Sequence, residues 1–140
     1  MKALLISKWV GDSKQLGLLR RLLGKEQLAG TKVFFCVTAA GSRGGLPEWA
    51  AADIEAWKKM GMDVDVCDIN GLSTDEIYVR MSNAELLYFE GGYTAWLNQK
   101  LAEVGAKEMF ERLLKTRCYV GKSAGGCVAS PFCMDTCTDW

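Results

Sequence analysis

The sequence contains no histidine. Histidine is the usual general base of enzymes at neutral pH, because no other unperturbed side chain titrates as close to neutrality. Its absence removes the ordinary proton acceptor from any hydrolytic mechanism within this chain. It also disfavours a zinc site that combines cysteine and histidine ligands.

An excess of charge of either sign is also lacking. Lys and Arg together number 17, and so do Asp and Glu. A chain without a basic field or a run of like charges is not expected to bind nucleic acid or an anionic membrane surface.

Long apolar runs are missing as well. No run approaches the ~20 residues that a membrane-spanning helix needs. The apolar start at Met1–Ile6 gives way to polar Ser7 and Lys8 too soon for the core of a signal peptide. We therefore expect a cytoplasmic protein with no membrane partner.

Six cysteines are present, but their spacing fits neither a metal site nor a disulfide framework. Cys36, Cys67 and Cys118 fall within apolar runs that predict strands, where cysteine behaves as a small buried hydrophobe. The other three, near the end of the sequence, form no C-x-x-C pair. We expect reduced, structural thiols and no metal site.

The 140 residues, 49% of them hydrophobic, predict one globular domain. Asp12 or Ser13 is a candidate helix N-cap and Gly24 a candidate helix end, while Ser73 and Glu76 have the spacing of a capping box. Pro47 stands where a helix takes its first residue. Apolar runs predict strands over 2–6, 32–38 (central), 63–68 (nearer an edge), 85–90 and the stretch around 118–120.

Strands that alternate with helices at this spacing predict a parallel sheet with helices on both faces, because each crossover connection is long enough to contain a helix. Ligands of such sheets bind at the carboxyl ends of the strands. Gly-rich loops follow the second, fourth and fifth strands and are expected at this one edge. The candidate ligand-binding residues of the first two loops are Arg43, Glu90, Gly91, Tyr93 and Thr94.

The stretch Tyr119–Gly126, YVGKSAGG, combines the end of a strand, a tight turn and the start of a helix. Its G-x-S-x-G pattern is typical of a nucleophile elbow, in which a sharp turn exposes a serine hydroxyl above a helix N-terminus. Ser123 is therefore the candidate nucleophile. The amide of Ala124 is a candidate donor to the oxyanion that forms when Ser123 attacks a carbonyl group.

Two other interpretations of this stretch compete with the first. In one of them, the residues of this stretch are small simply because a helix packs closely on a strand there. Gly121 to Ser123 also match the end of a phosphate-binding P-loop, but the first glycine of that motif would fall at Thr116, and strand residues replace its loop. We expect no cofactor.

Substitutes for the missing histidine are poor. Lys122 is adjacent to Ser123, so its side chain should leave the turn in a different direction. Glu90 is a weak base for a hydroxyl unless burial raises its pKa, and it is interpreted as a solvated or pocket-lining charge.

Two stretches together resemble the peptidase E family, the aspartyl dipeptidases and their cyanophycinase relatives, within the class I glutamine amidotransferase-like superfamily. Phe89–Thr94, FEGGYT, is similar to the family's Gly-Gly-Asn/Asp-Thr turn, and Tyr119–Gly125 is similar to its Gly-x-Ser-Ala-Gly elbow. The similarity extends from Met1 to about Pro131.

The resemblance implies a three-layer, flavodoxin-like α/β fold with a mostly parallel sheet. It implies a serine peptidase in which Ser123 is the nucleophile, the amides of Gly92 and Ala124 form the oxyanion hole, and a small peptide is the substrate. Aspartyl specificity is implied only by this resemblance.

Two departures from the family pattern are visible. Tyr93 stands where the family usually has Asn or Asp. The family's catalytic histidine and its acidic partner lie beyond the elbow helix, whereas this sequence ends at Trp140.

We expect residues 1–140 to form a single α/β domain without the family's C-terminal part. A sheet edge or apolar face left uncovered in this way favours self-association as a homodimer.

Three functions remain open at this point. The first is a serine hydrolase scaffold of dipeptidase type that works through an acyl-enzyme. The second is a non-catalytic module that binds a small anionic metabolite or a peptide at the same edge. The third is a shortened family member that keeps the fold and has lost the chemistry.

Overall fold

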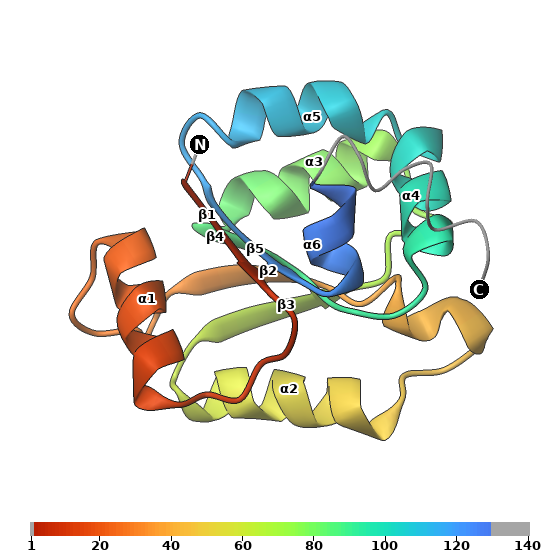
Figure 1. The fold of residues 1–140 in the computed structure, drawn as a ribbon. Coiled ribbons are helices and arrows are strands. Elements are labelled where there is room, and N and C mark those ends of the chain that lie inside the picture. The colour runs from red at the N-terminus through yellow and green to blue at the C-terminus, as the bar shows by residue number, and fades with distance from the viewer. Residues whose placement is uncertain (1, 130–140) are drawn as a thin grey trace.

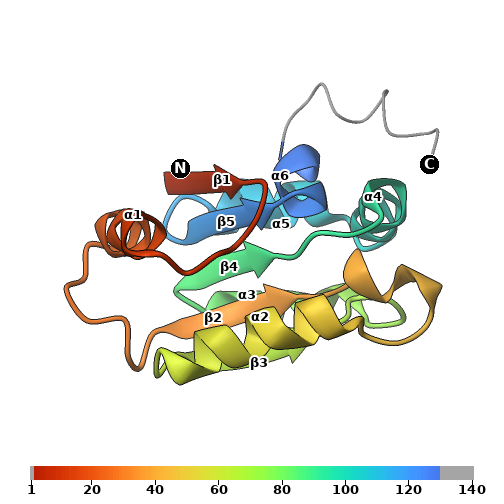
Figure 2. The ribbon, with the colours of Figure 1, turned by 60° about the horizontal axis from the view of Figure 1, so that its bottom comes forward.

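Five short strands form the centre of the structure, a computed structural model that describes residues 2–129. All five pair in parallel, in the order β1-β5-β4-β2-β3, and their arrowheads point the same way in Figure 2. Their bounds are β1 (Lys2–Ile6), β2 (Lys32–Cys36), β3 (Asp63–Cys67), β4 (Leu86–Phe89) and β5 (Cys118–Lys122).

Helices cover both faces of this sheet, with α1 and α2 on one face and α3 to α6 on the other (Figure 1). The predicted three-layer α/β fold is therefore confirmed for the described residues. The bounds are α1 (Ser13–Leu23), η1 (Ala40–Arg43), α2 (Glu48–Lys59), α3 (Thr74–Asn83), α4 (Thr94–Glu103), α5 (Ala106–Leu113) and α6 (Ala124–Val128).

The helix ends follow the local signals in the sequence. Asp12 caps α1, where its side chain accepts a hydrogen bond from the Gln15 amide, and Gly24 ends it in the left-handed conformation. Ser73 and Glu76 form the predicted capping box of α3. Pro47 is the N-cap of α2 instead of its first residue. The loop predicted after β2 contains the short 3-10 helix η1.

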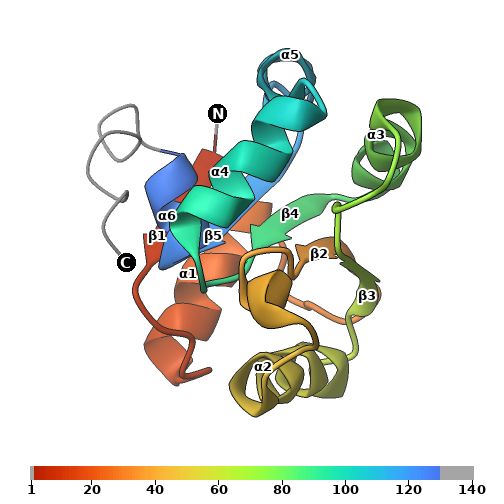
Figure 3. The same ribbon diagram turned by 90° about the vertical axis from the view of Figure 1, so that its right-hand side faces the viewer.

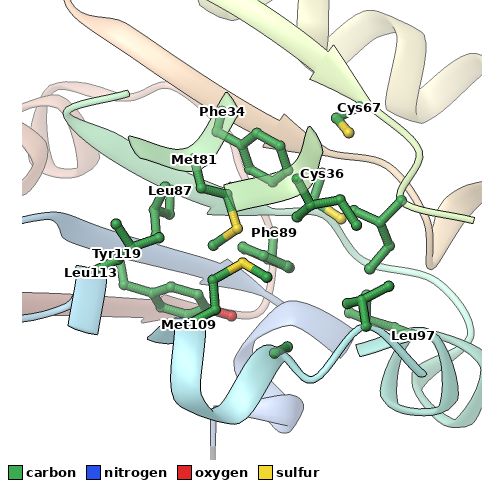
Figure 4. Packing of buried hydrophobic residues seen from close by; sticks show 14 of the residues in the cluster. Phe34, Cys36, Cys67, Met81, Leu87, Phe89, Leu97, Met109, Leu113 and Tyr119 are labelled. Carbon is green, nitrogen blue, oxygen red and sulfur yellow. The ribbon is translucent and has the colours of Figure 1, made fainter. Parts of the chain in front are cut away.

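Alternate residues of the inner strands fill two separate cores. Phe34, Phe89 and Tyr119 face α3, α4 and α5, and Figure 4 shows them with Met81 of α3, Leu97 of α4 and Met109 of α5. The residues between them, such as Phe35 and Tyr88, face α1 and α2. The predicted burial of β2 on both faces is thus confirmed, because only Lys32 of its five residues is exposed.

The two edge strands differ from the inner ones. β3 forms one edge, as predicted: Asp63, Asp65 and Val66 are exposed, Val64 is partly buried and Cys67 is buried. β1 forms the other edge, where the side chain of Leu5 is 53% exposed. Self-association through such an edge stays a prediction. Within residues 2–129, no helix combines the length and the apolar composition needed to cross a bilayer.

Two glycines test how tightly α6 packs on the sheet. A Cβ at Gly125 would lie 2.1 Å from the carbonyl oxygen of Phe89, whereas a Cβ at Gly17, inside α1, would meet nothing within 4 Å. We expect Gly125→Ala to destabilise the protein by about 2 kcal/mol or more. Gly17→Ala should stabilise it by about 0.5–1 kcal/mol, since alanine is the better helix former. Urea unfolding followed by circular dichroism measures both, and equal stability of the two variants would contradict the packing described.

Candidate active site

Ser123 lies where β5 ends and α6 begins, with its side chain exposed. Its φ of 46° and ψ of −108° make it the one non-glycine residue with positive φ among residues 2–129. Its amide donates to the carbonyl of Ile6 at 2.8 Å, so β1 holds the turn from the other side. Backbone strain of this kind costs about 1–3 kcal/mol and is concentrated at functional sites.

The small residues of the turn are required by close packing. A Cβ at Gly121 would lie 2.5 Å from the carbonyl oxygen of Gly125. The Tyr119 hydroxyl donates to that same oxygen at 2.6 Å and fastens α6 to β5. Close packing therefore explains the glycines. It does not explain a serine at position 123, where glycine would adopt the positive φ without strain.

The loop after β4 lies directly against Ser123. A Cβ at Gly91 would come within 3.2 Å of the Ser123 Cβ and 3.7 Å of its Oγ, so only glycine leaves the hydroxyl this space. Gly92 has a φ of 135°, and a Cβ there would lie 2.3 Å from the carbonyl oxygen of Ala39. Tyr93 donates its amide to the same carbonyl at 3.0 Å. The three Gly-rich loops thus meet at one edge of the sheet, as predicted.

The other predicted ligand residues surround this point less closely. Tyr93 is 39% exposed, and Thr94 is the first residue of α4. Arg43, the last residue of η1, is exposed, and its side chain forms no hydrogen bond or ion pair with the described part of the chain. Figure 3 views the molecule from the side to which the strands point, where α4, α6 and the loop after β2 come forward.

Glu90 does not have the environment expected from the sequence. The interpretation as a solvated charge is wrong, because Glu90 is 0% exposed. Its Oε1 accepts hydrogen bonds from the Gly91 amide at 2.6 Å and from Lys122 Nζ at 2.8 Å. Burial raises the pKa of Glu90, and these two donors oppose that rise. A buried carboxylate held in this way has no access to a substrate.

Lys122 leaves the turn away from Ser123, as predicted, and points toward α2. Its Nζ lies 2.5 Å from Asp53 Oδ2 and 4.7 Å from the centre of the Trp49 ring. Burial lowers the pKa of Lys122, but the carboxylates of Asp53 and Glu90 outweigh it, so the pKa is raised. Lys122 therefore stays an ammonium ion and does not serve as a base for Ser123.

Asp53 was not singled out from the sequence. It lies on α2, four residues from both Trp49 and Trp57, and its side chain is 15% exposed. Two features of the sequence could have indicated it. Asp53 is a carboxylate between two tryptophans at helical spacing, and Lys122 and Glu90 are charged residues at the ends of two apolar strands. Asp53 thus completes a group of two carboxylates around one ammonium ion.

Burial makes Cys36 and Cys67 poor nucleophiles. Burial raises the pKa of Cys36 to about 11 and that of Cys67 to about 12, so both are thiols at neutral pH. Both lie in the core on the side of α3, as their apolar surroundings predicted. The predicted thiols Cys133 and Cys137 lie outside the described residues.

Asp53, Lys122 and Glu90 contain two anions and one cation, so substitutions of the three residues should change the stability by different amounts. Lys122→Met leaves two buried carboxylates without a cation and should destabilise the protein by about 3–5 kcal/mol. Glu90→Gln leaves one pair, keeps an acceptor for the Gly91 amide and should cost less. The double variant should recover part of the loss caused by Lys122→Met. Chemical denaturation at neutral pH measures all three, and a larger loss for Glu90→Gln than for Lys122→Met would contradict this.

The sequence is similar to those of known peptidases. Residues 4–139 match the profile of Peptidase family S51. An uncharacterized peptidase of Listeria monocytogenes is 35% identical over 83 residues, which are 56% of this chain and 40% of that protein. One of Pasteurella multocida is 29% identical over 77 residues, 54% of this chain and 37% of that protein. The match thus spans about two fifths of the length of these relatives.

Solved structures agree with the sequence match. A crystal structure described as a peptidase E protein from Listeria monocytogenes EGD-e superposes with a TM-score of 0.77 at 27% identity, over 92% of this chain and 61% of that one. A peptidase from an acI-B1 Actinobacterium shares the fold alone, with a TM-score of 0.58 at 19% identity over 86% and 53% of the two chains. The profile match over nearly the whole sequence shows that the chain belongs to peptidase family S51.

Proposed function

We propose that this chain is a serine peptidase scaffold in which Ser123 is the nucleophile. The observation that carries the proposal is the strained, exposed Ser123, with the Gly91 backbone packed against its side chain. In the proposed reaction, Oγ bonds to the carbonyl carbon of a peptide while water or hydroxide takes its proton, and the carbonyl electrons move to the oxygen. Collapse of this intermediate re-forms the C=O bond and breaks the C–N bond, and the leaving amine takes a proton from water. The acyl-enzyme that remains is then hydrolysed by water.

The amides of Gly92 and Ala124 are the proposed oxyanion donors. Within residues 2–129, neither N–H group donates a hydrogen bond. Gly92 is exposed in the loop after β4, and Ala124 is the first residue of α6, where a helix has no internal partner for its N–H. Preorganised backbone donors of this kind stabilise the charge that develops on the oxygen.

The described residues hold no base suited to Ser123. The sequence has no histidine, Lys122 is bound by two carboxylates, and Glu90 is buried beneath the turn. Loss of the base of a serine triad costs on the order of a million-fold in kcat, and the remainder comes from binding and the oxyanion hole. The proposed scaffold is therefore expected to acylate slowly. A preference for peptides with aspartate rests on the resemblance of the two turns.

A module that binds a peptide without cleaving it is the second candidate. The observation in its favour is the same absence of a base among the described residues. Such a module needs the open edge of the sheet and does not need a reactive hydroxyl. Reaction at Ser123 therefore separates the two candidates.

We predict that a fluorophosphonate labels Ser123, at a rate that rises with pH because hydroxide or water must take the proton. In this step, Oγ bonds to phosphorus and fluoride leaves. Intact mass and peptide mapping measure the label, and Ser123→Ala is the matched control. Label spread over other serines, or equal label in Ser123→Ala, would contradict the proposal.

Hydrolysis of dipeptides that contain aspartate should be very slow with this 140-residue chain alone. Because the chain lacks a histidine, we expect kcat to fall far below the ordinary enzyme range of about 1 to 1000 per second. Product formation followed by chromatography over hours, with Ser123→Ala as the blank, measures it. A kcat within that range would show that a base is present, and Glu90→Gln would then be the first variant to assay.

A further inference from the structure

Asp53, Lys122 and Glu90 form an ion network beneath the candidate site. Glu90 directly precedes Gly91, and Lys122 directly precedes Ser123. The strands that carry them are paired, with Phe89 opposite Gly121. The two residues that lead into the two turns of the site are therefore bonded to each other, and Asp53 ties the pair to α2.

We propose that this ion network is a positioning device, which holds the Gly91–Gly92 turn and the Ser123 turn in a fixed relation. Its consequence for reactivity rests on the function proposed above. None of the three side chains is proposed to touch a substrate. They act on the positions of Ser123 and of the amide of Gly92.

One oxygen atom links the two turns. Glu90 Oε1 accepts from the Gly91 amide at 2.6 Å and from Lys122 Nζ at 2.8 Å. Hydrogen bonds to a charged acceptor are stronger than those between neutral groups. Gly91 has no side chain to restrict its backbone, so this bond adds a restraint on the peptide that leads into Gly92. The Gly91 backbone in turn packs on Ser123.

Stability alone does not account for the network. Two carboxylates share one ammonium ion, and replacing buried ion pairs by apolar residues of similar volume is often neutral or stabilising. Oε2 of Glu90 and the hydroxyl of Tyr88 are both buried, and neither forms a hydrogen bond of good geometry within the described part of the chain, although the two groups face each other. Burial of these charged and polar groups costs folding free energy. We infer that the network is kept because it fixes one geometry of the two turns.

The network is largely shielded from solvent on the side of α2, where the Asp53 side chain is 15% exposed. The Trp49 ring covers Lys122 Nζ, and Trp57 packs on Tyr88 with ring centres 4.5 Å apart. The titratable groups that face Glu90 are Lys122, Asp53 and Tyr88. Little water can replace a contact that is lost here. A change in the position of any of these side chains is therefore expected to shift the end of β4 or β5.

The structural test follows the backbone amides of Gly91, Gly92 and Ser123 by NMR in isotopically labelled protein. Glu90→Ala should shift or broaden all three signals and speed exchange of the Gly91 amide by about tenfold or more, since it loses an acceptor and an ion pair. Glu90→Gln, which keeps an acceptor, should preserve most of the native pattern. Arg80→Met, which removes the cation of the Arg80–Asp65 pair between α3 and β3, should leave all three unchanged. Changes confined to Gly91, with Ser123 unmoved, would overturn the proposal.

The reactivity test separates the rate of fluorophosphonate labelling from the fraction of protein that reacts. Glu90→Ala should lower the maximal rate constant of labelling at least tenfold, while the reagent concentration that gives half of the maximal rate stays the same. Glu90→Gln should restore much of the lost rate. Leu28→Ala, in the core just before β2 at the opposite end of the sheet, should lower only the reactive fraction. An unchanged rate constant in Glu90→Ala would overturn the positioning role.

The two tests fail in distinguishable ways. A wild-type chain that is never labelled at Ser123 contradicts the proposed peptidase function, while the amide signals still decide whether the network couples the two turns. A wild-type chain that is labelled normally, with variants that react at the same rate, supports the function and contradicts the network's role. Where Glu90→Ala does not fold, Asp53→Asn releases the Lys122–Glu90 pair from α2 and leaves that pair balanced in charge. Amide signals of Gly91, Gly92 and Ser123 and a labelling rate that all stay as in the wild type would then overturn the proposal.

Discussion

The parallel pairing of β4 with β5 is the constraint on which the site depends. It sets Phe89 opposite Gly121 and so brings the next residues of both strands to the same point at the edge of the sheet. Gly125 then packs on the carbonyl of Phe89, with no room for a Cβ. This contact places the start of α6, and with it Ser123, against the backbone of Gly91.

Much of this arrangement could be predicted from the sequence, because it depends on local signals. The five strands are short apolar runs, the caps at Asp12 and Ser73 have their expected partners, and the glycines mark places where the backbone approaches closely. Parallel topology then follows from the alternation of strands and helices. The strained turn at Ser123 was predicted because the G-x-S-x-G pattern has a mechanical cause, the sharp passage from strand to helix.

The surroundings of Glu90 could not be predicted in the same way. A charged residue that ends an apolar strand has two ordinary fates, exposure to water or burial beside an opposite charge, and the sequence around it is the same for both. The outcome depends on Asp53 and Lys122, which lie 37 positions before and 32 after it in the chain. Such long-range pairing is set by helix packing and strand order, so the structure was needed to show that this carboxylate is buried and bound to Lys122 and the Gly91 amide.

We propose that a substrate carbonyl bound to Ser123 directs its oxygen at the amides of Gly92 and Ala124. The most direct measurement is a crystal structure of this chain with a peptide boronic acid, whose boron bonds to Oγ and becomes tetrahedral. We expect a bond to Ser123 and a boronate oxygen about 3 Å from both amide nitrogens. A boronate bound elsewhere, or one whose oxygens all point away from these two amides, would contradict it.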